Sequence, residues 1–288
     1  MDRPLVFALS ALLCYGLADF VYKRAATAGI RADRLVMVQA WFFCPLVFLY
    51  ALAVGRLVPV PAASWGLLAG VLSLAGFYFF ARSLASGAVS TNASIFRLNF
   101  IVTVMLVIGL LGEPLTVLKA VGLAIALLAT WLLVGAASNA DRRADGARKR
   151  SLIEVAIATL SFGTANFVHT VGLRHGALPE TLAVAQAAVF MPLATLSVYV
   201  VDRRLRPATV TYRYSVIAAF LLAGATLLLL RGIAAGQATV VVPVSQMGFI
   251  VAAVLGIAVL HERLTLRKAV GLVAALAALA ALAASAPS

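Results

Sequence analysis

The sequence predicts an all-α membrane protein with ten transmembrane helices in two inverted five-helix repeats. Three observations lead to this prediction: the composition, the length of the apolar runs and an internal repeat. Of the 288 residues, 64% are hydrophobic and 11% are charged, and the mean hydropathy is +1.06. A soluble domain has about half apolar and roughly a quarter charged residues. The chain therefore lacks the polar surface that water requires, and a lipid bilayer is its natural solvent.

Ten apolar segments have the length of a membrane-spanning helix, which needs about 20 residues. Six of them contain no Asp, Glu, Lys or Arg, and four are interrupted by one or two charges. No small-residue cleavage site follows the first segment, so we expect a membrane helix there and not a removed signal peptide. The ten segments are 4–22, 35–55, 57–81, 89–111, 120–140, 152–172, 181–201, 213–231, 232–260 and 269–288.

A polar, charged stretch divides the chain near its middle, and the sequences on its two sides resemble each other. Gly16-Leu-Ala-Asp-Phe-Val21 matches Gly163-Thr-Ala-Asn-Phe-Val168 at an offset of 147 residues, which becomes 149 later in the chain. Chance matches between two Ala- and Leu-rich chains would not recur at Gln, Pro, Glu, Thr and Lys. We predict a first repeat at 1–137, a linker at 138–150 and a second repeat at 151–288. Further matched pairs are Gln39 and Gln186, Phe43 and Phe190, Pro45 and Pro192, Arg82 and Arg231, and Gly87 and Gly236.

The distribution of basic residues fits an inverted repeat. Five spans are an odd number, so the second repeat must enter the membrane from the opposite side. Sixteen of the 23 Lys and Arg residues then fall on the side that holds the linker, and five fall on the other side. By the positive-inside rule the linker is cytoplasmic and both termini lie outside. The basic residues on the linker side are Lys23, Arg24, Arg31, Arg34, Arg142, Arg143, Arg148, Lys149, Arg150, Arg203, Arg204, Arg206, Arg213, Arg263, Arg267 and Lys268.

Each half closes with the pattern Glu-x-Leu-Thr-x-x-Lys-Ala-Val-Gly-Leu, at 113–123 and 262–272. Together with ten spans in inverted halves, this pattern resembles the drug/metabolite transporter superfamily, EamA type. The resemblance covers nearly the whole chain, and 112–116 and 261–265 are its most specific parts. It implies a central cavity surrounded by the first, third, fourth, sixth, eighth and ninth helices, with the fifth and tenth at the periphery. It also implies export of small metabolites, for which a YddG-like amino-acid exporter is one branch.

Two charged residues inside apolar spans are the strongest site candidates, because an ion within a bilayer is costly unless it is paired or hydrated. Asp19 lies in the first span and Arg97 in the fourth, and their repeat mates are the neutral Asn166 and Gln246. In one interpretation the charges form a structural ion pair, or Asp19 neutralises Lys23 near the interface. In the other, Arg97 binds a substrate carboxylate while Asp19 binds an ammonium group or carries a proton. The second arrangement suits a zwitterion such as an amino acid.

Neutral polar and aromatic residues complete the predicted substrate site. Each polar candidate could instead form an interhelical hydrogen bond, and most aromatic residues are expected at lipid or at the membrane interfaces. Tyr78 is chosen because the resemblance places the third helix on the cavity. The recurring Gln39 and Gln186 are interpreted as interhelical bonds or kink formers. The predicted substrate-binding residues are Asp19, Arg97, Tyr78, Asn99, Asn166 and Gln246.

The recurring acids Glu113 and Glu262 have a structural interpretation. Each stands just before a threonine, Thr116 or Thr265, that we expect to cap the helix that follows. An acidic side chain near a helix N-terminus interacts favourably with the helix dipole. We therefore expect both acids to stabilise the starts of the fifth and tenth helices and not to bind substrate.

No sequence motif indicates a catalytic, metal or nucleotide site. The chain has no GxxxxGK[ST] motif, no His/Cys cluster and no Ser/His/Asp set for nucleophilic catalysis. We expect no enzyme activity, no metal and no cofactor. Nucleic acid is excluded as a partner, since the basic residues sit in short clusters between apolar runs. The expected partners are a small-molecule substrate, a coupled proton and the lipid bilayer, and both a monomer and a homodimer fit the sequence.

The sequence thus predicts a secondary transporter in the bacterial inner membrane that works by alternating access around a midplane cavity. Amino acids are the expected cargo, and export is the expected direction. Within the same superfamily, a drug, nucleotide-sugar or lipid-linked-sugar transporter is the alternative. From other classes, the alternatives are an integral membrane enzyme that acts on lipids and a membrane scaffold or receptor without transport.

Overall fold

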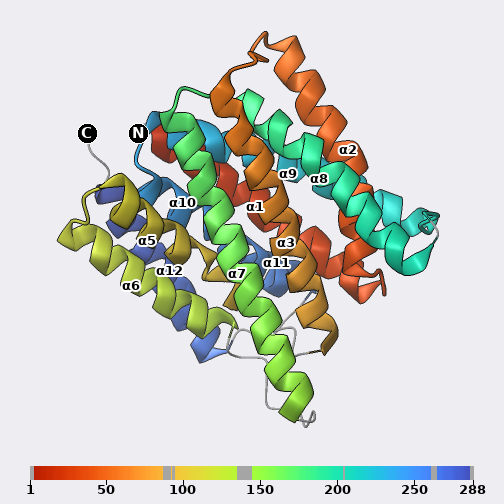
Figure 1. Cartoon of the computed structure of the whole chain (residues 1–288). Helices are drawn as coiled ribbons and strands as arrows, with labels where there is room; N and C mark the ends of the chain where they lie inside the picture. The colour runs from red at the N-terminus through yellow and green to blue at the C-terminus, as the bar shows by residue number, and fades with distance from the viewer. Residues whose placement is uncertain are drawn as a thin grey trace.

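The computed structural model is a bundle of helices (Figure 1). It describes residues 3–86, 92, 95–134, 145–203, 205–260 and 265–285, and every secondary-structure element in those ranges is a helix. The helices are α1 (Arg3–Thr27), α2 (Ala32–Ala53), η1 (Pro61–Ala63), α3 (Ser64–Ser86), α5 (Asn99–Leu111), α6 (Val117–Val134), α7 (Asp145–Arg174), α8 (Pro179–Asp202), α9 (Thr209–Ala235), α10 (Ala238–Gln246), α11 (Phe249–Leu260) and α12 (Leu266–Ala284).

The helix lengths confirm the predicted all-α membrane class. Eight helical stretches in the described part of the chain are long and apolar enough to span a membrane, and two shorter apolar helices cover Ile95–Leu111 and Val117–Leu132. The boundaries differ from the predicted ones in several places. Helix α7 begins at Asp145, inside the predicted linker at 138–150. Helix α9 continues to Ala235, and the predicted segment 232–260 is divided into α10 and α11.

Contacts at one end of the bundle fix the directions of several helices. Pro4 at the start of α1 lies against Gly236, just after the end of α9. Arg231, near the end of α9, forms an ion pair of 2.5 Å with Glu180 at the start of α8. The start of α1, the end of α9 and the start of α8 therefore share one end of the molecule, called here the N-terminal end.

The same reasoning places the remaining helices of the core. Gly172 near the end of α7 lies against Trp65 at the start of α3 and Leu182 at the start of α8, so α7 ends and α3 begins at the N-terminal end. At the opposite end, called here the linker end, Arg34 at the start of α2 binds Asp202 at the end of α8 at 2.9 Å. Each of α1, α2 and α3 therefore runs opposite to its sequence mate, α7, α8 or α9. An inverted repeat produces this arrangement.

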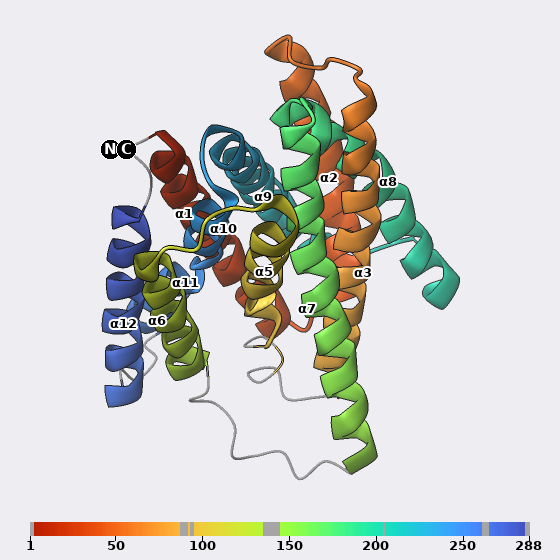
Figure 2. The same cartoon turned by 60° about the vertical axis from the view of Figure 1, so that its left-hand side comes forward.

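Helices of the two halves alternate in the bundle. Helix α3 of the first half packs on α7 and α8 of the second half. In the same way, its repeat mate α9 packs on α1 and α2 of the first half. Helix α5 packs on α7, just as α11 packs on α1. Helices α6 and α12 pack on each other at one edge of the molecule (Figures 1 and 2). The peripheral position that the family resemblance implied for these two helices is therefore observed.

Two glycines allow the closest backbone approaches of this arrangement. A Cβ atom on Gly16 of α1 would collide with the carbonyl oxygen of Gly248 and with Val251, and a Cβ atom on Gly163 of α7 would collide with the carbonyl oxygen of Asn99 and with Val102. The two contacts are equivalent under the offsets of 147 and 149. The glycines match in sequence because both crossings need the same absent side chain.

Glu113 joins three parts of the chain at the N-terminal end. Its carboxylate accepts a hydrogen bond from Arg174 of α7 at 2.6 Å and the backbone N–H bonds of Ala238 and Thr239 at 3.2 and 3.0 Å. The expected capping role is therefore correct in kind but falls on α10 and not on the following helix α6. Glu262 lies outside the described residues.

The predicted threonine caps are confirmed. Thr116 accepts a hydrogen bond from the backbone N–H of Lys119, and Thr265 accepts the equivalent bond from Lys268, each at 3.3 Å. These bonds satisfy N–H groups in the first turns of α6 and α12 that have no partner within the helix.

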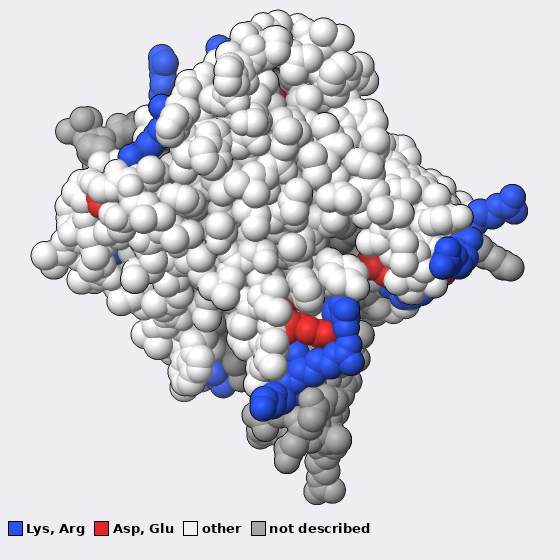
Figure 3. All heavy atoms as spheres, viewed as in Figure 1, with Lys and Arg blue, Asp and Glu red and all other residues white. Residues whose placement is uncertain are grey.

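A broad uncharged surface covers the face shown in Figure 3. Charged side chains gather toward the lower edge, the right-hand edge and the upper left of that view, and the large area between them is uncharged. Lipid tails cannot solvate ions, so this distribution fits a molecule whose middle is in contact with a bilayer.

We expect Gly163→Ala to lower the thermal unfolding midpoint of the purified protein, because its Cβ would force α7 away from Asn99 and Val102. Gly109→Ala is the matched control, since a Cβ at that position meets nothing within 4 Å. Alanine favours a helix over glycine by about 1 kcal/mol, so the control should match or exceed the wild-type midpoint. Thermal unfolding in detergent measures both variants, and equal midpoints would contradict the proposed crossing.

Candidate functional site

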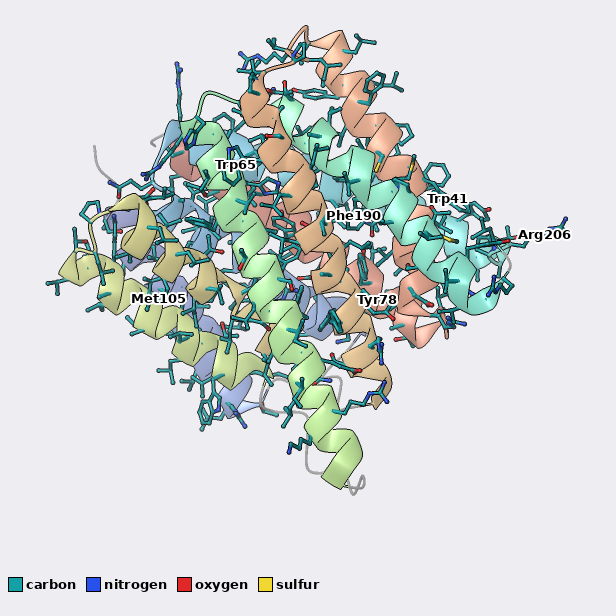
Figure 4. All side chains as sticks on the ribbon, in the orientation of Figure 1. Trp41, Trp65, Tyr78, Met105, Phe190 and Arg206 are labelled. Atoms are coloured by element: carbon teal, nitrogen blue, oxygen red, sulfur yellow. The ribbon has the colours of Figure 1, made fainter. Side chains whose placement is uncertain are left out.

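A pocket lies in the interior of the bundle, between α1, α2, α3, α7, α8 and α9. It has about 560 Å³ of empty space, its mouth included. Figure 4 shows Phe190, one of its lining residues, between α3 and α8 near the centre of the molecule. The fourteen described residues that line the pocket are Tyr15, Gln39, Phe43, Ser73, Phe77, Phe162, Asn166, His169, Gln186, Phe190, Leu222, Thr226, Leu229 and Leu230.

Most of these residues are repeat mates of one another, so both halves contribute equivalent positions to the pocket wall. The four remaining residues, Asn166, His169, Leu229 and Leu230, all come from the second half. The pocket is therefore centred where the two halves meet, and it extends along the last turns of α7 and α9 toward the N-terminal end. The mated pairs are Tyr15 with Phe162, Gln39 with Gln186, Phe43 with Phe190, Ser73 with Leu222 and Phe77 with Thr226.

Two helix breaks lie at equivalent positions of the halves. The backbone N–H of Leu98 donates to the oxygen of Ile95 at 3.0 Å, and that of Met247 donates to Val244 at 3.2 Å. These bonds join residues three apart instead of four, which interrupts the regular helix. The offset of 149 residues relates the donor Leu98 to the donor Met247 and the acceptor Ile95 to the acceptor Val244. Broken helices at matching positions are typical of substrate sites in transporters built from repeats.

The linker end of the pocket is closed by one ion pair, one hydrogen bond and an aromatic stack. Arg97 donates a hydrogen bond to Asp19 and forms an ion pair with it. The hydroxyl of Tyr22 donates to the side-chain oxygen of Gln39. Phe80 and Phe96 stack with ring centroids 4.3 Å apart. These contacts join α1 to α2, and they join both α1 and α3 to the segment that precedes α5.

Among the described residues, the equivalent positions at the N-terminal end form no ion pair and no aromatic stack, and His169 approaches Gln186 without a well-formed hydrogen bond. Asn166 and Gln246 stand where the ion pair would be, and Asn166 Nδ2 and Gln246 Nε2 are both buried without a hydrogen-bond partner. Leu229 and Ser245 replace the stacked rings Phe80 and Phe96. Smaller or neutral side chains at this end leave the space into which the pocket extends.

Comparison with known proteins agrees with this geometry. Residues 3–135 match the family model of the EamA-like transporter family. This chain carries an EamA domain. No curated protein matches the chain. One solved structure, described only as a protein crystal structure, shares the fold with a TM-score of 0.81 over 96% of this chain and 95% of its own, at 15% identity.

The EamA match covers the first predicted repeat and supports a membrane protein of a transporter family and not of an enzyme family. Among the described residues, no group of three or more His, Cys, Asp or Glu side chains could hold a metal ion. The likeness to the solved structure extends over 96% of this chain, so that shared fold includes the second half as well.

The EamA fold brings only some of the predicted site residues together. Asp19 and Arg97 meet as a pair, whereas Asn166 lines the pocket. Asn99 donates to the carbonyl oxygen of Phe96 at 2.8 Å and is buried at the helix break, and Gln246 is buried at the equivalent break. The break residues therefore support the site without being among the described residues that line it.

Tyr78 lies outside the lining of the pocket. Its side chain is 36% exposed and contacts Arg82, one turn further along α3 (Figure 4). The neighbouring residue Phe77 faces the pocket instead. One residue corresponds to a rotation of about 100° around a helix, so the run Phe77-Tyr-Phe-Phe80 could not indicate which ring faces inward.

Sequence reasoning did not assign Gln39, Gln186, Phe43 and Phe190 to the site. All four line the pocket, and all four recur at the offset of 147. Repetition of polar and aromatic residues inside apolar spans was thus the signal that could have identified them. Helices α2 and α8, which correspond to the second and seventh predicted spans, also line the pocket, although the family resemblance did not place those two spans around the cavity.

We expect Arg97→Gln to lower the free energy of unfolding by about 1 kcal/mol, the low end of the cost of leaving a buried partner unsatisfied, because Asp19 is only partly buried. The double variant Asp19→Asn with Arg97→Gln copies the neutral pair of the other end and should be less destabilised than the single variant. Denaturation of the purified variants in detergent gives both values. A double variant that is the less stable of the two would show that the charges themselves hold the fold.

Proposed function

We propose that the chain is a secondary transporter that moves small organic metabolites through the central pocket by alternating access. The observation that carries this proposal is the difference between the two ends of the pocket. Repeat-related positions are filled by Asp19, Arg97 and stacked rings at the linker end and by Asn166, Gln246 and smaller side chains at the N-terminal end. Transport then consists of opening the first end and closing the second.

The Asp19–Arg97 pair acts as the gate at the linker end in this proposal. Their side chains are 30% and 19% exposed, so the pair is partly screened by water and can separate without leaving two ions in dry protein. A proton on Asp19 would weaken the pair, which gives a coupled proton a direct way to favour opening. In the structure this gate is shut.

Amino-acid export is the finer cargo hypothesis, and it rests on the same two residues. A zwitterion would bind Arg97 and Asp19 by replacing each as the other's partner. The pair would therefore be both gate and site. Drugs, nucleotide sugars and lipid-linked sugars remain cargo alternatives within the superfamily.

We also propose an orientation in the bacterial inner membrane. The linker end carries most of the basic residues, so it faces the cytoplasm, and both termini face the periplasm. The pocket extends toward the N-terminal end, which is the periplasmic end in this orientation.

We expect Arg97→Ala to reduce transport at least about tenfold, the effect of about 1.4 kcal/mol, while the protein still reaches the membrane. Arg206→Ala is the control, since Arg206 is exposed and extends away from the bundle (Figure 4). Counterflow of labelled amino acids, nucleosides and quaternary amines into proteoliposomes measures the effect. Normal counterflow by the Arg97 variant would remove Arg97 from gate and site.

Alternating access predicts that cysteines placed at Leu229 and Phe80, which are repeat mates at the two ends of the pocket, react with a thiol reagent at different rates. In a background without Cys14 and Cys44, a membrane-impermeant maleimide added outside intact cells should label position 229 faster than position 80; because Leu229 is only 2% exposed in this structure, that labelling requires the N-terminal end to open. Adding Asp19→Asn and Arg97→Gln should raise labelling of position 80 in inverted vesicles. Equal labelling of both positions from one side would contradict the gate assignment.

A further inference from the structure

The residues that line the pocket indicate which kind of ligand it binds, independently of the proposed gate. None of its fourteen described lining residues is Asp, Glu, Lys or Arg. The charges of the predicted site, Asp19 and Arg97, are partly buried and neutralise each other. An ionised ligand would therefore enter a low-dielectric space without a counter-charge, which is strongly unfavourable. The wall favours an uncharged ligand.

Three side chains place buried hydrogen-bonding atoms without a well-formed partner in this pocket. Asn166 Nδ2 is an unused donor. Gln186 Oε1 and the ring nitrogens of His169 lie close enough for the two side chains to interact, but they do not meet in hydrogen-bond geometry. Asn166 and His169 are each only 4% exposed. Buried polar groups are normally satisfied, so these atoms indicate a ligand edge that offers an acceptor beside a donor.

Aromatic rings form much of the remaining wall, beside three leucines, a serine and a threonine. Phe77 meets Phe162 with ring centroids 5.2 Å apart and Phe190 with centroids 5.9 Å apart, both nearly perpendicular. Phe43 and Tyr15 line the same space. Such a box presents ring faces and edges to its contents, and aromatic pairs gain energy beyond their buried area. A flat ring makes better use of this wall than an aliphatic chain does.

We propose that the pocket binds an uncharged planar aromatic or heteroaromatic ring whose edge carries a hydrogen-bond acceptor beside a donor, as an aromatic carboxamide does. The acceptor of the ligand meets Asn166 Nδ2, and its donor meets Gln186 Oε1. This inference rests on the proposed transport function, because it identifies the cargo of the same pocket. It also departs from the amino-acid hypothesis, in which charges at the gate select the cargo.

Isothermal titration of the purified full-length protein tests this ligand class. The probes are benzamide and nicotinamide, which are neutral, benzoate and nicotinate, which are anions of the same shape, benzylamine, which is a cation, and phenylalanine, which is a zwitterion. We expect both amides to bind at least about tenfold more tightly than the four charged probes. Tighter binding of benzoate, benzylamine or phenylalanine would overturn the inference.

Variants of the two polar groups locate the binding. Asn166→Leu and Gln186→Leu, on different helices, should each weaken benzamide binding at least about tenfold. Thr164→Val is the matched control on α7, since Thr164 only bonds to the carbonyl oxygen of Leu160 and does not line the pocket. Asn166→Asp keeps the shape but adds a negative charge, so it should increase the affinity for benzylamine. Folded variants that bind benzamide as the wild type does would overturn the assignment.

Counterflow separates this inference from the transport proposal. If the protein does not bind benzamide but its proteoliposomes exchange phenylalanine, the transport proposal stands and the proposed ligand class is wrong. Amide binding without counterflow of any probe would support the pocket and refute transport. Exchange of labelled nicotinamide faster than in protein-free liposomes, with loss of that excess in Gln186→Leu, is the expected result.

Discussion

Two backbone contacts hold the site in place: α1 crosses the α10–α11 break at Gly16, and α7 crosses the equivalent break at Gly163. In a bilayer, backbone that leaves the helical pattern must be covered by protein or must line a wet cavity, because lipid offers no hydrogen bonds. The glycines permit this cover by letting a whole helix lie directly on the interrupted turn. Without them, the breaks at Leu98 and Met247 would be exposed and the pocket would lose its two supports.

One backbone plan is therefore used twice, and the side chains make its two ends differ. Asp19, Arg97 and Phe96 fill one end, whereas Asn166, Gln246 and Ser245 occupy the same positions at the other. A charged pair and stacked rings hold their elements together more strongly than neutral side chains that do not meet. The asymmetry of the structure thus follows from a few substitutions between repeats and requires no difference in fold.

The sequence was sufficient for the features that depend on periodicity and repetition. Apolar runs predicted the helices, and the offset of 147 predicted which elements would be equivalent. Interruptions at Leu98 and Met247 were not predictable, because a hydrogen bond between residues three apart has no residue signature there; Pro243 lies inside α10, four residues before the break at Met247. The inward ring of α3 was also missed, since Phe77 and Tyr78 are both aromatic and only packing decides which one faces the pocket.

The other differences between expectation and structure concern which groups become hydrogen-bond or ion-pair partners. Glu113 precedes α6 in sequence, and local rules assigned it to that helix. In the structure its carboxylate reaches the start of α10 and the end of α7. An acid satisfies whichever free N–H groups the tertiary fold brings near, and a single sequence does not show which helices will be neighbours. For the same reason Asp19 and Arg97 could be named as partners but not distinguished as gate or pocket.

The alternation of halves in the bundle has a consequence for biogenesis. Helices α1, α2 and α3 have their main neighbours in α9, α8 and α7, all of which are synthesised later. After the ribosome has completed the first half, those helices can be inserted in the membrane, but the surfaces that will meet the second half still face lipid. The protein cannot mature one half at a time. Its tertiary structure assembles only when the last helices have entered between the first.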